Sequence, residues 1–136
     1  MSRQARSAWL LIGLALAACT SNKIEPEPEP NIVPTTYKQE ILDTLARTLD
    51  DPTNVREASI SQPELLTAGH DQRYTVCVRY NPRDLSRRYL GPQVRIGYFF
   101  AGHLNQLVEA TPEQCARAAY KPFPELEKLC LASKCD

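Results

Sequence analysis

Several features that mark large classes of protein are missing from this sequence of 136 residues. Its main apolar run, residues 8–16, is much shorter than the ~20 residues that a transmembrane helix needs. Basic residues are not in excess, because 16 Lys and Arg face 16 Asp and Glu, and this balance argues against nucleic-acid binding. No C-x-x-C, G-x-S-x-G, P-loop or H-E-x-x-H motif occurs, so the common metal, redox and catalytic signatures are absent.

The first 18 residues have the composition of a secretory targeting segment. Arg3 and Arg6 form a short positive region, and the apolar run at 8–16 follows them. This length fits the apolar region of a signal peptide. Residues 1–18 are therefore predicted to be a signal peptide that is removed on export.

The apolar run ends in Leu16-Ala17-Ala18-Cys19. This segment resembles the lipobox of bacterial lipoproteins. The resemblance implies that the Cys19 thiol receives a diacylglycerol, that a peptidase cleaves before Cys19, and that the new amine is acylated as well. The alternative is a plain signal peptide with an incidental cysteine. Several acyl chains hold a protein stably on a bilayer, whereas one chain binds reversibly.

The mature chain would begin at Cys19 and be slightly acidic. Cleavage removes two arginines and no acid, which leaves 14 basic against 16 acidic residues and a net charge of −2. Thr20 stands where enterobacterial lipoproteins that stay in the inner membrane carry Asp. By that analogy we expect the periplasmic face of the outer membrane, with the lipid bilayer as a partner through Cys19.

Residues 19–35 are predicted to be a tether. Its Glu-Pro repeat, residues 25–30, cannot form a helix, because proline lacks an N–H and fixes φ. Polyproline II is expected instead, stiffened by repulsion between the glutamates. At ~3.1 Å per residue, the tether would place the following domain up to ~50 Å from the bilayer.

Residues 36–136 are predicted to form a single disulfide-stabilised periplasmic domain of the α+β class. Thr36 and Gln39 are spaced as a capping box, and a second box occurs at Thr111 and Gln114. The expected architecture is an N-terminal helix packed on a four-stranded antiparallel meander, with a disulfide-linked helical segment at the C-terminus. The expected elements are a helix at 36–50, strands at 56–61, 74–80, 94–100 and 104–109, a helix from 111, and a helical turn at 125–131.

Two predicted strands alternate clearly between apolar and polar positions. In 74–80 the residues Tyr74, Val76, Val78 and Tyr80 share one face, and Cys77 and Arg79 lie on the other. In 94–100 the apolar face carries Val94, Ile96, Tyr98 and Phe100. We expect the apolar face of the sheet to be covered by the N-terminal helix.

Three segments resemble small alphaproteobacterial envelope lipoproteins of unassigned function. They are Val-Cys-Val-Arg-Tyr-Asn at 76–81, Phe-Phe-Ala-Gly at 99–102 and Tyr-Lys-Pro-Phe-Pro-Glu-Leu at 120–126. None of them is a catalytic signature. The resemblance therefore implies a cell location more than an activity.

Four cysteines remain after Cys19, and export would place them in an oxidising compartment. Four cysteines allow three pairings, of which we favour Cys77–Cys115 with Cys130–Cys135. The first pair would clip the second helix to the sheet face that carries Cys77, and it would add on the order of 4 kcal/mol to the stability of the domain. Metal and redox roles are the alternatives, but ligand spacing to the histidines is lacking.

No arrangement of nucleophile and base is apparent, so no catalytic residue, cofactor or metal ligand is assigned. His70 and His103 lie in predicted turns and are interpreted as exposed loop residues. One surface feature remains, the loop at 81–91, which carries Arg83, Arg87, Arg88 and Tyr89. Arginine pairs with carboxylates and phosphates, so this loop could contact peptidoglycan, lipopolysaccharide or an acidic protein patch. The alternative is a solvated hairpin connection.

These observations favour a non-enzymatic, membrane-anchored lipoprotein that acts as a structural or interaction module of the outer-membrane envelope. The rival hypothesis is a periplasmic inhibitor or a small-ligand binder. A protruding loop able to enter an enzyme cleft would favour the inhibitor. A flat exposed patch that contains the arginines would favour the interaction module. A concave pocket that gathers a histidine with acids would favour an enzyme instead.

Overall fold

The computed structural model describes residue 26 and residues 29–129. The predicted signal peptide, Cys19, most of the tether, Cys130 and Cys135 lie outside the described residues. Within these residues, no helix has both the length and the apolar character needed to cross a membrane.

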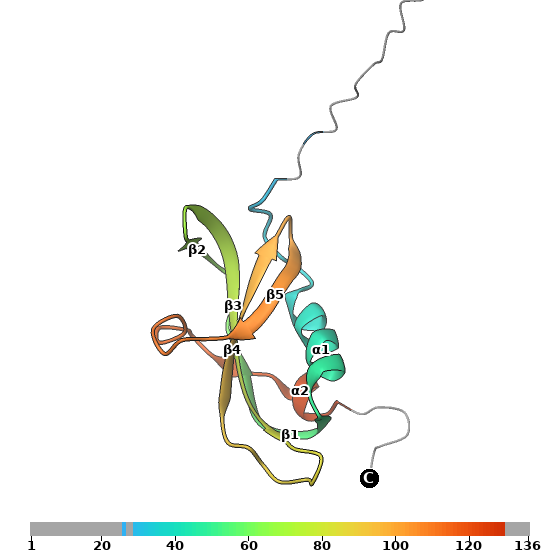
Figure 1. Cartoon of the computed structure of the whole chain (residues 1–136). Helices are drawn as coiled ribbons and strands as arrows, with labels where there is room; N and C mark the ends of the chain where they lie inside the picture. Colours follow the sequence, from blue (N-terminus) through green and yellow to red (C-terminus); the bar gives the residue numbers. More distant parts are fainter. Residues whose placement is uncertain (1–25, 27–28, 130–136) are drawn as a thin grey trace, which may run out of the picture.

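The fold is α+β, as predicted, and is built on one antiparallel sheet (Figure 1). The strand order is β5-β4-β3-β1-β6, and β2 pairs with β3 beside this path. Figure 1 shows both helices on one side of the sheet and the chain between β5 and β6 on the other. The elements are α1 (Tyr37–Thr48), β1 (Asp51–Ile60), β2 (Glu64–Ala68), β3 (Asp71–Arg83), β4 (Gln93–Phe100), β5 (His103–Glu109), β6 (Lys121–Pro122) and α2 (Pro124–Glu127).

The prediction of four strands was wrong, because the sheet has six. β3 is 13 residues long and pairs with β1 along one half and with β2 along the other. Between β1 and β2, the Ser61 N–H donates to the Cys77 carbonyl at 2.8 Å, and the Ser61 hydroxyl accepts from the Cys77 N–H at 2.9 Å. The sequence of β2, Glu-Leu-Leu-Thr-Ala, does not alternate, and β6 has only two residues, so neither strand has a clear periodic signal.

β1 is longer and less regular than the strand predicted at 56–61. Its register with β3 shifts between Asp51 and Arg56 and again between Arg56 and Ser59. Asn54 and Glu57 have positive φ values of 54° and 55°, as expected at bulges. These irregularities explain why the alternation of the sequence is weak there.

α1 begins one residue later and ends two residues earlier than predicted, and its capping box is not formed. The Thr36 hydroxyl donates to Glu40 Oε1 at 2.6 Å instead of pairing with the backbone of Gln39. The Gln39 amide donates to Asp43 at 2.8 Å. The helix is held by packing, since Ile41 and Leu45 are fully buried against the sheet.

The sheet has apolar residues on both faces. The face covered by α1 and α2 carries the predicted face of β3, which packs with Phe99. The apolar face of β4 was assigned to the wrong side of the sheet, because Ile96 pairs with Cys77 and lies on the opposite face with Val94 and Tyr98. Whether one face of a strand lies in the core depends on its register with the neighbouring strand.

The helix predicted from Thr111 does not form. Residues 112–117 are a series of turns, in which the Gln114 N–H donates to the Thr111 carbonyl and the Ala118 N–H to the Cys115 carbonyl. One half of the predicted capping box is present, because the Thr111 N–H donates to Gln114 Oε1 at 2.7 Å. The short helix predicted at 125–131 corresponds to α2, which begins one residue earlier and ends at Glu127.

Candidate functional site

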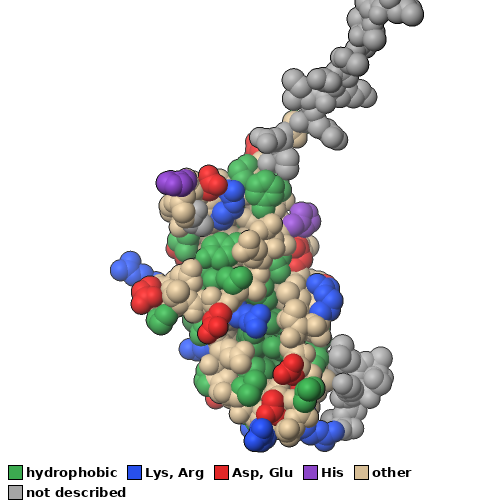
Figure 2. Space-filling view, viewed as in Figure 1, with side chains coloured by type: hydrophobic (Ala, Val, Ile, Leu, Met, Phe, Trp, Pro, Cys, Tyr) green, Lys and Arg blue, Asp and Glu red, His purple; other side chains and the backbone are tan. Residues whose placement is uncertain are grey.

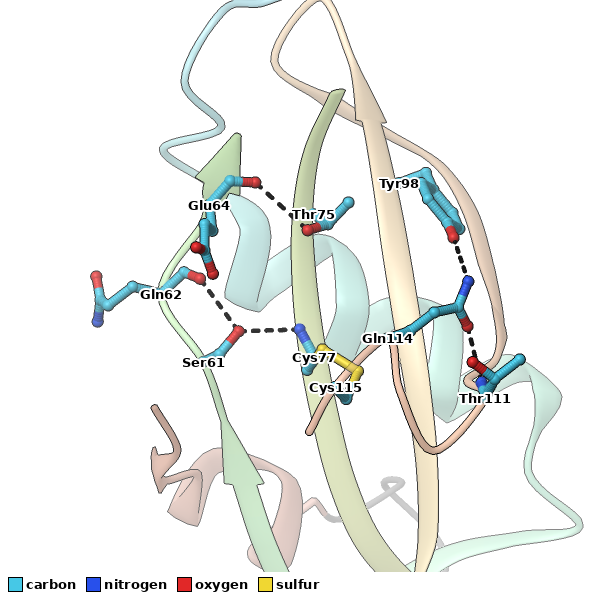
Figure 3. Close-up of a disulfide and its surroundings, with 9 residues drawn as sticks. All are labelled: Ser61, Gln62, Glu64, Thr75, Cys77, Tyr98, Thr111, Gln114 and Cys115. Carbon is cyan, nitrogen blue, oxygen red and sulfur yellow. Dashed lines mark hydrogen bonds between the residues drawn. A yellow bond between two sulfur atoms is a disulfide. The ribbon is translucent and has the colours of Figure 1, made fainter. Parts of the chain in front are cut away.

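A disulfide joins Cys77 on β3 to Cys115 in the turns after β5, with the two Cα atoms 5.9 Å apart (Figure 3). This bond confirms the predicted pairing of Cys77 with Cys115. Both cysteines are buried and form a second small core with Ile96, on the sheet face opposite the helices. Gln114 extends the attachment, because its amide donates to the Tyr98 hydroxyl at 2.9 Å (Figure 3). The disulfide therefore holds residues 110–120 as a separate layer.

An open groove of about 800 Å³ lies beside this layer. A second hollow of about 590 Å³ adjoins it on the side of β1, and Arg79, Pro92 and Tyr120 line both. We call the two together the Arg79–Tyr120 groove. The charged residues that line it are Glu57, Arg79, Arg95, Glu109 and Lys121. Arg95 is paired with Val78 and Glu109, and Lys121 with Ile60, so these three side chains lie on the helix side of the sheet and Glu57 and Arg79 are left as the charges of the groove.

The centre of this groove is an arginine stacked on an aromatic ring. The Arg79 guanidinium carbon lies 4.8 Å from the centroid of the Tyr120 ring, a cation–π distance. Burial raises the pKa of the Tyr120 hydroxyl, and the positive charge of Arg79 partly opposes this. Within the described chain, Arg79 has no ion pair with a carboxylate. The ring therefore holds the Arg79 guanidinium at the groove, and a guanidinium can pair with a carboxylate or a phosphate.

Two buried hydroxyls, Ser59 Oγ and Tyr80 Oη, lack hydrogen bonds to any residue that the structure describes. Ser59 is paired with Arg79 in the sheet and lies on the groove face, whereas the Tyr80 ring lies in the core on the helix side. Burial raises the pKa of Tyr80, and the nearby Arg95 acts in the opposite direction. Buried polar atoms without partners are uncommon in native proteins.

The arginines of the predicted contact loop differ in their surroundings. Arg83 forms an ion pair with Asp51 at 2.8 Å, and both side chains are largely buried. Burial favours the neutral Asp51 carboxyl, but hydrogen bonds from Thr53 and the charge of Arg83 outweigh it and lower the pKa of Asp51. Arg83 thus ties the end of β3 to the start of β1, and folding does use this arginine.

The other three candidate residues lie on the loop itself. Arg88 pairs with Asp84 at 3.2 Å but remains 79% exposed, and Arg87 is exposed at a φ of +62°. The Arg88 backbone N–H is the main cause of a lowered pKa at Asp84. Tyr89 lies back against β1, where its hydroxyl donates to the Asn54 carbonyl at 2.8 Å and its ring stacks with Arg56 at 4.2 Å.

The two histidines lie far apart on the surface, as the purple side chains in Figure 2 show. His70 is exposed in the turn between β2 and β3. The His103 Nδ1 lies 3.3 Å from Glu40 Oε1 and its side chain is 80% exposed. Neither histidine lines the Arg79–Tyr120 groove. No cluster of three or more His, Cys, Asp or Glu suited to a metal ion occurs among the described residues.

Compared with known proteins, the chain gives no significant match to any family model, curated protein or solved structure. The site therefore has to be interpreted from its own geometry. Sequence reasoning did not identify Arg79 and Tyr120 as a pair, although a signal was present. Arg79 was placed on the face of Cys77, so a bond from Cys77 to Cys115 brings the segment before Tyr120 across that same face.

Proposed function

We propose that this chain is a non-enzymatic, membrane-anchored lipoprotein of the periplasm, held at the outer membrane by acylated Cys19. The Cys77–Cys115 disulfide is the observation that carries this proposal. A disulfide persists in oxidising compartments and is rare in the cytosol, so it fits an exported chain. The lipobox-like Leu16-Ala17-Ala18-Cys19 supplies the route of export and the anchor.

The domain is proposed to act as an interaction module for an anionic component of the envelope. Two surfaces support this role, the arginine stacked in the Arg79–Tyr120 groove and the exposed Arg87 and Arg88 of the loop. The rival proposal of a small-ligand binder has support of its own, because a groove of about 800 Å³ is in the range of small-molecule sites.

The anchor is tested by the change Cys19→Ser. This change removes the thiol that would accept the diacylglycerol, so palmitate labelling in cells should be lost and an unprocessed precursor or a soluble species should accumulate. Thr20→Ala is the matched control and should keep its label, since the neighbouring side chain takes no part in the thioether. Palmitate labelling that persists in Cys19→Ser would refute the lipoprotein assignment.

A further inference from the structure

The Arg79–Tyr120 groove lies at the end of the sheet remote from the place where the chain enters the domain. The entering segment packs on the turn between β4 and β5, where the Ala101 N–H donates to the Pro30 carbonyl at 3.3 Å. Gly102 is so close that a Cβ there would lie 3.2 Å from Ile32 Cγ2. The groove is lined instead by the start of β4 and by Pro92 before it. β4 runs between these two ends and spans about 23 Å at ~3.3 Å per residue (Figure 1).

This remote end is rich in charge of both signs. Figure 2 shows cations and acids together at the end that lies lowest in the view. Arg79 faces the groove, and Arg87 and Arg88 stand on the adjoining loop. The acids nearby are Glu57 in the groove, Asp84, which is paired with Arg88, Asp51, which is paired with Arg83, and Asp50 beside it. Residues 36–136 contain 13 basic and 13 acidic residues, so Arg87 and Arg88 make the loop locally positive in a domain that is otherwise balanced.

We propose that the Arg79–Tyr120 groove binds the peptide side chains of the cell wall through their free carboxylates. This inference rests on the proposed lipoprotein anchor, which sets the orientation of the domain. Arg79 pairs with a carboxylate of the peptide, and Tyr120 holds the guanidinium in place for it. Arg87 and Arg88 add a local positive field that attracts the anionic polymer.

Two observations favour a wall peptide over other anions. Glu57 lines the same groove without an ion pair among the described residues, and it disfavours a ligand that is only anionic, such as a lipid phosphate cluster. A wall peptide carries free amino groups as well as carboxylates, and Glu57 can receive its ammonium. The groove, at about 800 Å³, is also in the size range of small-molecule sites, and this suits one short peptide segment.

The test measures binding of the full-length lipoprotein in detergent to purified, protease-treated peptidoglycan. Arg79→Gln keeps the length and polarity of the side chain but removes its charge. We expect about tenfold weaker binding, since a charge-assisted hydrogen bond is lost. Arg47→Gln is the matched control, because Arg47 is also exposed but lies on the last turn of α1, on the helix side of the sheet. Its binding should equal that of the wild type.

Competition identifies the chemistry of the ligand. A soluble muropeptide should displace the protein from peptidoglycan, and the same muropeptide with its carboxyls amidated should not. Equal binding of wild type and Arg79→Gln would overturn the proposal, as would preference for lipopolysaccharide vesicles over peptidoglycan. Binding to untreated peptidoglycan that is lost after the peptidoglycan is treated with protease would assign the groove to a protein partner, and this result would also overturn the proposal. Failure of the lipoprotein assignment can be distinguished from failure of this proposal, because palmitate labelling tests the anchor and the peptidoglycan assay tests the groove.

Discussion

Arg83 and Arg87 are four positions apart in one loop, yet they contribute to the molecule in different ways. Arg83 is held by Asp51 and Thr53 on the neighbouring strand, whereas Arg87 is exposed. The sequence suggested only a partner contact for both arginines. The ion pair with Asp51 gives Arg83 a structural role, so the two residues form a matched pair for mutation.

Arg83→Gln is expected to lower the free energy of unfolding at pH 7 by about 1–3 kcal/mol, because it leaves the largely buried Asp51 carboxylate without its partner. Arg87→Gln should change it by less than about 0.5 kcal/mol. The pH dependence follows from Asp51, whose pKa lies below 3.8 in the folded protein. Its contribution is complete above that value and is lost as the pH falls through the lower, folded pKa.

Asp51→Asn should therefore be less stable at neutral pH and should lose less stability than the wild type on acidification below pH 4. Urea unfolding at several pH values measures both effects. Equal stability losses for Arg83→Gln and Arg87→Gln would show that the ion pair contributes nothing measurable.

Gly97 leaves room for the Leu104 side chain of β5 on the sheet face that α1 covers. A Cβ at this position would lie 3.0 Å from Leu104 Cδ1 and 3.7 Å from Ile41 Cδ1 on α1. Gly97→Ala should lower the free energy of unfolding by about 1–2 kcal/mol, because overpacking costs roughly 1–3 kcal/mol and exceeds the roughly 0.5 kcal/mol gained in the unfolded chain. The penalty should shrink in a Leu104→Ala background, where the nearest atom is gone. An unchanged penalty in the double variant would place the strain elsewhere.

At the scale of elements, the segment from 110 to 120 depends on a covalent bond where a helix was expected. Its turns make few backbone hydrogen bonds, and only Cys115 is fully enclosed by other residues. Thr111 and Gln114 form one local hydrogen bond that is typical of a helix start. The segment is then attached to Cys77 by the disulfide and to Tyr98 by a hydrogen bond, and no helix follows. Local capping and tertiary attachment thus favoured different structures, and the attachment prevailed.

Removing this bond should destabilise the domain strongly. The Cys77→Ser/Cys115→Ser double variant is expected to lose about 4 kcal/mol, because the bond closes a loop across 38 positions in the unfolded chain. Serine has nearly the same size, so packing changes little. Denaturant unfolding with and without a reductant measures the effect, and the reductant should no longer alter the stability of the variant through this pair. A difference below about 1 kcal/mol would contradict a role for the disulfide in stability.

At the scale of the whole molecule, charge is distributed unevenly along the long axis of the domain. The loop at the remote end carries Arg87 and Arg88, whereas the mature chain has a net charge of −2. If the loop attracts an anionic polymer over a distance, salt should weaken the attraction within the Debye length of roughly 10 Å at 0.1 M.

The Arg87→Ala/Arg88→Ala double variant should therefore bind peptidoglycan with a flatter dependence on salt, while its melting temperature stays close to that of the wild type. Co-sedimentation across a salt series measures this. The Arg47→Ala variant removes a cation from the opposite side of the sheet and should keep the wild-type slope. Identical salt dependences of binding for all three proteins would show that the loop only connects two strands and does not attract the polymer.

The sequence by itself determined the features that depend on local pattern. The order of the expected helices and strands predicted the α+β class. Alternation predicted the buried face of β3 and put Cys77 on the opposite face, from which the bond to Cys115 was favoured among three pairings. These inferences succeeded because a period of two is a property of the strand alone.

Tertiary structure alone decided which residues meet across strands. The register of β4 with β3 sent Ile96 to the disulfide side, and Arg83 found Asp51 from 32 positions away. The meeting of Arg79 with Tyr120 likewise required the sheet, the disulfide and the return of the chain through β6. Register and long-range pairing are set by the packing of the whole domain, and no local period encodes them.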